Sequence, residues 1–115
     1  MEQALLIIDN TFMSPVLQNP LLIGTDIVMH SITKYIGGHS DVVAGALMFN
    51  EAKVYDELYC NIKSMGYYIS PFDAFLALKG SKTVKLRVER AMENVLAVAK
   101  MIEKHPKIQK VLYPG

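Results

Sequence analysis

The sequence predicts an α/β fold, in which a mostly parallel sheet is flanked by helices. Three short and mostly apolar runs, at residues 4–8, 26–30 and 42–49, have the length of β-strands. A run that is apolar along its whole length is typical of parallel sheets, because both faces of such a strand are buried. Two longer segments, residues 51–64 and 81–105, repeat apolar side chains every three or four residues, which indicates amphipathic helices.

Turn residues separate the first two predicted strands. Residues 4–8 read Ala-Leu-Leu-Ile-Ile and stop at Asp9, which marks the carboxyl end of the first strand. Pro15 and Pro20 enclose a segment with room for one helical turn. Gly24 then provides a turn ahead of the second strand.

The first long helix is predicted over residues 51–64. Its apolar stripe consists of residues at intervals of four, namely Val54, Leu58 and Ile62. Gly66 and Pro71 follow the helix and predict a loop, since both residue types interrupt regular structure.

The second long helix is predicted to begin after Ser81, a suitable N-cap, and to stop at His105 because Pro106 cannot continue it. These limits give about 24 residues and a length of roughly 36 Å. A compact domain of 115 residues has a radius of gyration of only about 13 Å. Part of the apolar stripe should therefore face surface that this chain does not provide. Arg87 and Arg90 are expected on the solvated face of this helix.

Composition narrows the class of protein. The 115 residues are enough for one small domain, and 51% hydrophobic with 20% charged residues excludes an intrinsically disordered chain. A net charge of +1 predicts neither a nucleic-acid partner nor an anionic membrane partner. Cys60 is the one cysteine, which excludes a disulfide framework and favours a reducing compartment. Residues 4–8 are too few for a signal-peptide core or a membrane span.

Three strands are few for a parallel sheet, because an average sheet has five or six and both faces need helices. Residues 107–111 are predicted to begin one more strand. We therefore expect the chain to be an internal or terminal piece of a larger α/β protein. Expressed alone, it should be marginally stable, oligomeric or dependent on a partner.

Candidate functional residues follow the first two predicted strands. Asp9 comes after the first, and Ser31, Thr33 and Lys34 come at the end of the second. Open α/β sheets bind ligands beyond the carboxyl ends of their strands, so these side chains are expected to share one crevice. Each residue alone is more typical of a solvated turn.

The residue types in this crevice are compatible with pyridoxal phosphate. Two hydroxyls at alternate positions can donate to phosphate oxygens. A partly desolvated lysine can lose its proton and attack a carbonyl carbon. A carboxylate can keep a pyridine nitrogen protonated, so that the ring withdraws electrons. Spacing alone leaves the alternative of solvated turn residues open. His39 and Asp41 have no third ligand nearby, so no metal site is predicted.

Several motifs in fixed order carry a resemblance to a known family. They lie at residues 8–12 (Ile-Asp-Asn-Thr-Phe), 26–35, 37–43 (Gly-Gly-His-Ser-Asp-Val-Val), 70–76 (Ser-Pro-Phe-Asp-Ala-Phe-Leu), 79–83 and 105–115. Through them the chain resembles the Cys/Met-metabolism family of pyridoxal-phosphate enzymes, which act in trans-sulfuration. The resemblance extends over nearly the whole chain.

The resemblance implies a role for each of five residues. Lys34 matches the catalytic lysine that bonds covalently to pyridoxal phosphate. Asp9 matches the carboxylate paired with the pyridine nitrogen. Ser31 and Thr33 match hydroxyls that bind the cofactor phosphate, and Thr11 matches a residue near the ring. The resemblance implies no metal.

The resemblance also implies a division of the chain. Residues 1–80 would be the C-terminal part of the large cofactor-binding domain of an aspartate-aminotransferase-like (fold type I) enzyme. Residues 81–105 would be a long linker helix, and residues 106–115 the start of a C-terminal domain that is otherwise missing.

The activity implied is that of a carbon–sulfur lyase most like the γ-lyases of the family, which convert cystathionine to cysteine, 2-oxobutanoate and ammonia. A cystathionine γ-synthase or methionine γ-lyase activity is an alternative, and a truncated, non-catalytic remnant is another. The family implies a cytoplasmic homotetramer with a small amino-acid substrate, and neither a nucleic-acid nor a membrane partner.

Overall fold

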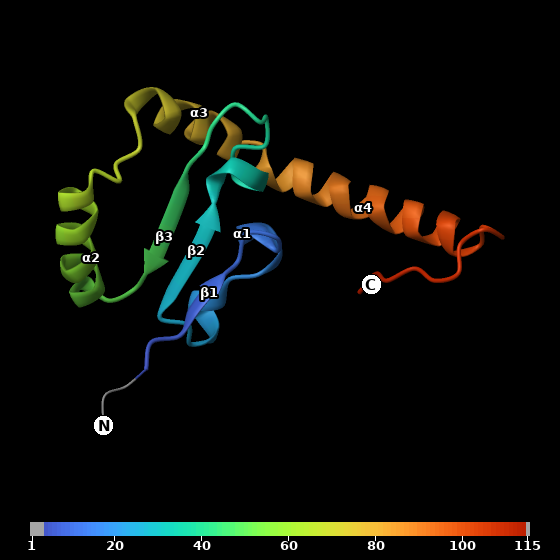
Figure 1. Ribbon diagram of the computed structural model, residues 1–115, viewed down its shortest axis with the longest axis horizontal. Helices are drawn as coiled ribbons and strands as arrows, with labels where there is room; N and C mark the ends of the chain where they lie inside the picture. The colour runs from blue at the N-terminus through green and yellow to red at the C-terminus, as the bar shows by residue number, and fades with distance from the viewer. Residues whose placement is uncertain (1–3, 115) are drawn as a thin grey trace.

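The computed structural model of this chain describes residues 4–114. Residues 1–3 and Gly115, the outer ends of the predicted segments 1–80 and 106–115, lie outside the described residues. A three-stranded sheet in the order β1-β2-β3 lies at the centre of Figure 1. Its strands are β1 (Ile7–Asp9), β2 (Ile27–Ser31) and β3 (Gly45–Phe49). The α/β class predicted from the sequence is therefore confirmed.

The sheet is half parallel rather than mostly parallel. Strands β1 and β2 are parallel, with Asp9 beside Met29. Strand β3 is antiparallel to β2, with Gly45 beside Ser31, so the prediction for this strand was wrong. A parallel strand requires a crossover, usually a long helix. Residues 32–44 instead hold only the five-residue helix η2 (Ile32–Ile36) and a loop that turns the chain back.

Two short helices, α1 (Ser14–Leu17) and η1 (Pro20–Ile23), connect β1 to β2. Each has proline in its first turn, where the missing N–H costs no hydrogen bond. Gly24 ends η1 with φ of 98°, a left-handed conformation that suits glycine. The single helical turn predicted between the prolines is thus confirmed.

Helix α2 (Ala52–Met65) lies beside β3. Its first and last residues are each within about one residue of the predicted limits. It ends at Gly66, whose φ is 72°. The amide of Tyr67 donates to the carbonyl of Ile62 at 3.1 Å, which closes the last turn.

Helix α3 (Pro71–Ser81) was not predicted, because Gly66 and Pro71 were assigned to a loop. Proline at the first helical position starts this helix. The Ser70 hydroxyl caps it by accepting from the amide of Asp73 at 3.1 Å and donating to the Asp73 carboxylate at 2.8 Å.

Helix α4 (Val84–Glu103) confirms the long helix, with shorter limits than predicted. Ser81 is not its N-cap, because Ser81 ends α3 and donates its hydroxyl to the carbonyl of Leu78 at 2.8 Å. The helix extends away from the sheet in Figure 1, and its fully buried residue is Val88. Within residues 4–114, the segment 107–111 forms no strand, so that prediction was wrong.

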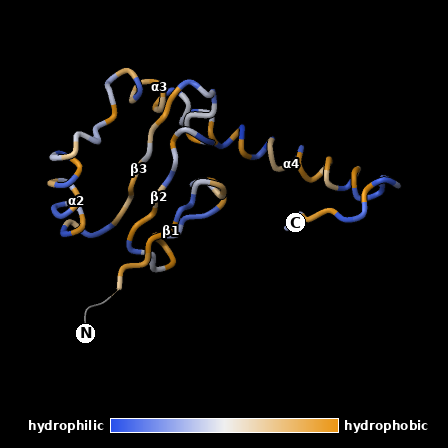
Figure 2. The backbone as a smooth tube through the Cα atoms, in the orientation of Figure 1, coloured by the Kyte–Doolittle hydropathy of each residue, from blue (hydrophilic) through white to orange (hydrophobic). Residues whose placement is uncertain are grey.

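Many apolar side chains of this chain are exposed to solvent. The buried hydrophobic residues are Ile27, Val28, Val42, Ala77 and Val88. The first strand, predicted to be buried on both faces, leaves Leu5, Leu6 and Ile7 exposed at 57%, 53% and 59%. Figure 2 shows this apolar stretch beside the sheet. The radius of gyration is 17.8 Å, against about 13 Å for a compact chain of this length. None of the helices in residues 4–114 is both long and apolar enough to span a bilayer.

Helices η2, α3 and α4 meet at a junction where glycine is required. A Cβ on Gly80, which is buried in α3, would overlap the carbonyl oxygen of Gly37. A Cβ on Gly38 would overlap the guanidinium of Arg87. The backbone of α3 therefore lies directly against the end of η2.

Replacing Gly80 with alanine should destabilise the protein by about 1–3 kcal/mol, because the new methyl group would push α3 away from Gly37. Helix propensity alone predicts the opposite sign, a stabilisation of about 1 kcal/mol. Thermal or denaturant unfolding of the complete gene product measures the difference. Ser81→Ala, one residue away, is the control and should change stability by less than about 0.5 kcal/mol. A stabilised Gly80→Ala protein would contradict the close contact.

Candidate functional site

The carboxyl ends of β1 and β2 form one edge of the sheet, as expected for parallel neighbours. Asp9 ends β1 and Ser31 ends β2. Thr11 joins them, since its amide donates to the Asp9 carboxylate at 2.9 Å and its hydroxyl accepts from the Ser31 amide at 2.8 Å. The structure therefore brings three of the five predicted site residues together in one chain of hydrogen bonds.

The Asp9 carboxylate is held in its ionised form. Hydrogen bonds from the hydroxyl and then the amide of Thr11 lower the pKa of Asp9 below its ordinary value, and the nearby charge of His30 adds to this effect. Burial opposes the shift only weakly, because the carboxylate is exposed. His30 is buried, and burial lowers the pKa of its imidazole while the charge of Asp9 partly counteracts the shift.

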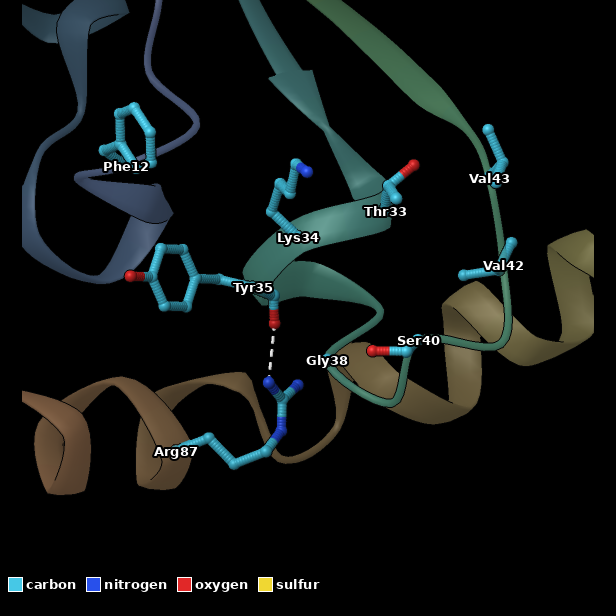
Figure 3. A pocket seen from close by; sticks show the side chains of 9 residues that line it. All are labelled: Phe12, Thr33, Lys34, Tyr35, Gly38, Ser40, Val42, Val43 and Arg87. Atoms are coloured by element: carbon cyan, nitrogen blue, oxygen red, sulfur yellow. Dashed lines mark hydrogen bonds between the residues drawn. The ribbon is translucent and has the colours of Figure 1, made fainter.

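Lys34 lies in η2, three residues beyond the end of β2. Its backbone (φ −88°, ψ −115°) leaves the helical conformation inside this short helix. Figure 3 shows the side chain of Lys34 pointing away from Arg87. Among residues 4–114, the Lys34 amine forms neither an ion pair nor a hydrogen bond. The amine is thus available to a ligand.

A cavity of about 600 Å³ surrounds Lys34. Its lining residues come from the loop after β1, from η2 and its following loop, and from α4, namely Phe12, Thr33, Lys34, Tyr35, Gly38, Ser40, Val42, Val43 and Arg87. Asp9, Thr11 and Ser31 do not belong to this lining within the described part of the chain. The five predicted residues therefore divide between the strand edge and the cavity.

The two predicted phosphate-binding hydroxyls differ in their surroundings. Thr33 donates its hydroxyl to the carbonyl of Ala44 at 3.3 Å and accepts from the amide of Ala44 at 3.0 Å, which ties η2 to the segment before β3. The Ser31 hydroxyl makes no hydrogen bond to protein within residues 4–114. Ser31 is therefore the freer donor of the two.

The loop after η2 is held by its own polar groups. His39 Nδ1 lies 2.7 Å from the carbonyl oxygen of Gly37. Ser40 adopts a left-handed backbone with φ of 58°. Among the described residues, no three histidine, cysteine, aspartate or glutamate side chains come together to hold a metal ion.

Sequence reasoning missed Arg87, which was assigned to a solvated helix face. Arg87 donates to the carbonyls of Tyr35, Ile36 and Gly80 and thus connects α4 to η2 and α3. Helical periodicity carries no signal for a contact between residues 52 positions apart. Arg90 does lie on the solvated face, where it pairs with Glu93 at 2.9 Å.

The ionised carboxylate of Asp9 and the free amine of Lys34 follow the carboxyl ends of the strands of an α/β sheet. Ligand sites of such sheets are typically found at this place. The whole chain, residues 1–115, matches the model of the Cys/Met metabolism PLP-dependent enzyme family. The chain belongs to this family. The resemblance noted in its motifs is confirmed.

Curated relatives with this sequence similarity include both lyases and synthases. The chain is 54% identical to cystathionine gamma-lyase of Dictyostelium discoideum and 50% identical to cystathionine gamma-synthase of Mycobacterium tuberculosis (strain ATCC 25618 / H37Rv), over 97% of its length in both alignments. A solved cystathionine gamma synthase from Xanthomonas oryzae pv. oryzae aligns over 97% of the chain with a TM-score of 0.93 and 46% identity. The chain spans about 29% of the length of each of these proteins.

The residues of the strand edge and of η2 fit the family's cofactor, pyridoxal phosphate. An ionised carboxylate at Asp9 suits a protonated pyridine nitrogen. The free amine of Lys34 suits an aldehyde, and the free hydroxyl of Ser31 suits a phosphate oxygen. Asp9 and Ser31 end neighbouring parallel strands, and Lys34 follows Ser31 by three residues in η2.

Thr11→Val should raise the pKa of the Asp9 carboxyl, because the Thr11 hydroxyl is the largest cause of its depression. A carboxyl whose pKa is lowered on folding stabilises the fold above about pH 4, and this contribution is lost as the pH falls through the lowered pKa. The variant should therefore lose less stability on acidification. Carbon-13 NMR titration of the aspartate carboxyls measures the shift, with Asp56 on α2 as the internal reference. An unchanged Asp9 titration would show that Thr11 does not hold the carboxylate.

Proposed function

We propose that the complete protein is a pyridoxal-phosphate-dependent carbon–sulfur lyase of trans-sulfuration. The reaction is the cleavage of cystathionine, with water, to cysteine, 2-oxobutanoate and ammonia. The observation that carries the proposal is that Asp9 and Ser31 end adjoining parallel strands, while the Lys34 amine, which has no partner within residues 4–114, lies three residues beyond the end of β2. Membership of the family and the similarity to a cystathionine gamma-lyase support it.

Residues of this chain hold the cofactor in the proposal. Lys34 Nζ would bond to its aldehyde carbon with loss of water, and Asp9 would accept a hydrogen bond from its pyridine nitrogen. Ser31 donates to its phosphate, and Thr33 joins Ser31 after releasing its bond to the Ala44 carbonyl. Thr11 keeps Asp9 ionised and oriented through the hydrogen bonds described above.

Bound in this way, pyridoxal phosphate supplies an electron sink for the bonds of the substrate α-carbon. With the substrate bound, Lys34 Nζ would be the base that accepts the proton of the substrate α-carbon. It is also the acid that returns protons as the γ-carbon–sulfur bond breaks. Asp9 stays ionised throughout, since its hydrogen bonds hold its pKa below the ordinary value.

The proposal extends to the organisation of the whole protein. Residues 1–80 would form part of the cofactor-binding domain, residues 81–105 a linker helix and residues 106–115 the start of a further domain. The open apolar surface of β1 and α4 supports burial against more protein, either from the same polypeptide or from a homotetramer. The single exposed Cys60 is compatible with the cytoplasm as its compartment.

Lys34→Arg should abolish covalent attachment of pyridoxal phosphate in the complete gene product, because a guanidinium keeps the charge but is not a nucleophile at neutral pH. Borohydride reduction fixes the bond, and peptide mass spectrometry locates the label. Lys85→Arg, on α4, is the matched control and should keep the label at Lys34. A label on another lysine of the wild-type protein would overturn the assignment, and no label at all would support a non-catalytic remnant.

A γ-synthase is the second candidate function, favoured by the 50% identity to a mycobacterial cystathionine gamma-synthase and by the fold shared with the Xanthomonas enzyme. A lyase should release 2-oxobutanoate and cysteine from cystathionine. A synthase should form cystathionine from cysteine and an acylated homoserine. Comparing kcat/KM for the two reactions decides between them, and we expect the lyase reaction to be faster. A faster synthase reaction would reverse the assignment.

A further inference from the structure

Within residues 4–114, Arg87 makes more side-chain hydrogen bonds than any other residue. It lies in the first turn of α4, four residues after Thr83, the residue that precedes this helix. Its Nε donates to the Thr83 hydroxyl at 3.1 Å, which fixes the direction of the guanidinium. Its Nη1 donates to the carbonyl of Tyr35 at 2.7 Å, and its Nη2 donates to the carbonyls of Ile36 at 3.2 Å and Gly80 at 2.8 Å.

The carbonyls of Tyr35 and Ile36, at the end of η2, need a donor from outside this helix. The last carbonyls of a helix have no amide of the same helix to pair with. At the end of η2, the amides of Gly37 and Gly38 turn back to the carbonyls of Ile32 and Lys34. The carbonyls of Tyr35 and Ile36 receive the guanidinium instead. Bonds from an ionised donor are roughly twice as strong as neutral ones, so this contact is a firm attachment of α4 to η2.

Two glycines make room for this attachment. Gly38, with φ of 74°, lies so close to the guanidinium that any side chain there would displace it. Gly80 allows α3 to touch the carbonyl of Gly37. Figure 3 shows Arg87 reaching from α4 to the carbonyl of Tyr35 on the side of η2 opposite to the Lys34 amine.

We propose that Arg87 is a positioning residue for Lys34, because it clamps the two carbonyls that follow Lys34 and so fixes the backbone from which the reacting amine extends. Lys34 has no side-chain partner within residues 4–114, so its amine is aimed by its backbone alone. The backbone of Lys34 departs from the helical conformation, and the carbonyls that Arg87 holds belong to the next two residues, Tyr35 and Ile36. This inference rests on the proposed function of Lys34.

The test uses two substitutions of Arg87 in the complete gene product. Arg87→Met keeps an unbranched apolar stem and removes every donor. Arg87→Lys keeps the positive charge. Its single amine can donate to one carbonyl but cannot form the branched set of hydrogen bonds that a guanidinium makes. Arg90→Met is the matched control, because Arg90 lies on the same helix, is exposed and pairs only with Glu93 among the described residues.

The readout is kcat per mole of borohydride-fixed cofactor, with KM measured alongside it. A role in stability alone would lower the melting temperature and the yield of loaded protein but leave this normalised kcat unchanged. A misplaced amine instead slows proton transfer and leaves substrate binding intact. We expect Arg87→Met to lower the normalised kcat by about 10- to 100-fold with little change in KM. Arg87→Lys should recover part of the loss, and Arg90→Met should match the wild type.

An unchanged normalised kcat in both Arg87 variants would overturn the inference. If Arg87→Met yields no folded protein, Arg87→Lys decides by the same criterion. Absence of a borohydride-fixed label at Lys34 in the wild-type protein would overturn the proposed function, and this inference with it. A labelled wild type with unaffected Arg87 variants would overturn the inference and leave the proposed function standing.

Discussion

The parallel pairing of β1 with β2 is the constraint on which the candidate site depends. With Asp9 beside Met29, both strands end at one edge, and the polar residues that follow them are delivered to the same place. A shift of one residue would turn every side chain of β1 to the other face of the sheet. The hydrogen bonds from Thr11 to Asp9 and from Ser31 to Thr11 hold this register beyond the end of β1.

Close backbone contact supplies the second constraint, at the junction of η2, α3 and α4. Small residues at positions 37, 38 and 80 let three helices approach until a carbonyl or a guanidinium occupies the place of a side chain. Arg87 donates to the carbonyls of Tyr35 and Ile36, which η2 does not pair by itself. Helix η2, which carries Lys34, is therefore attached to the sheet on one side and to the long helix α4 on the other. The fold thus joins the sheet edge and α4 through the segment that carries Lys34.

Most errors of the sequence reasoning have a common physical origin. The two long helices and the strands β1 and β2 were predicted because hydrophobic periodicity and length are local properties. The antiparallel direction of β3 was missed, since pairing direction depends on how residues 32–44 fold. The helix α3 was missed for a different reason, because Pro71 was taken as a break although Ser70 caps it and places it at the first helical position.

The amino-acid sequence by itself determined the α/β class, the long amphipathic helix, the family and the placement of Asp9 and Ser31 at the ends of two neighbouring strands. These follow from periodicity and from motifs that are continuous along the chain. Only the tertiary structure decided that Thr33 is bound to Ala44 while Ser31 is free, and that Arg87 grips the turn after Lys34. Contacts between residues far apart in the chain depend on how whole helices and strands pack. No local sequence pattern encodes the distance between two packed backbones.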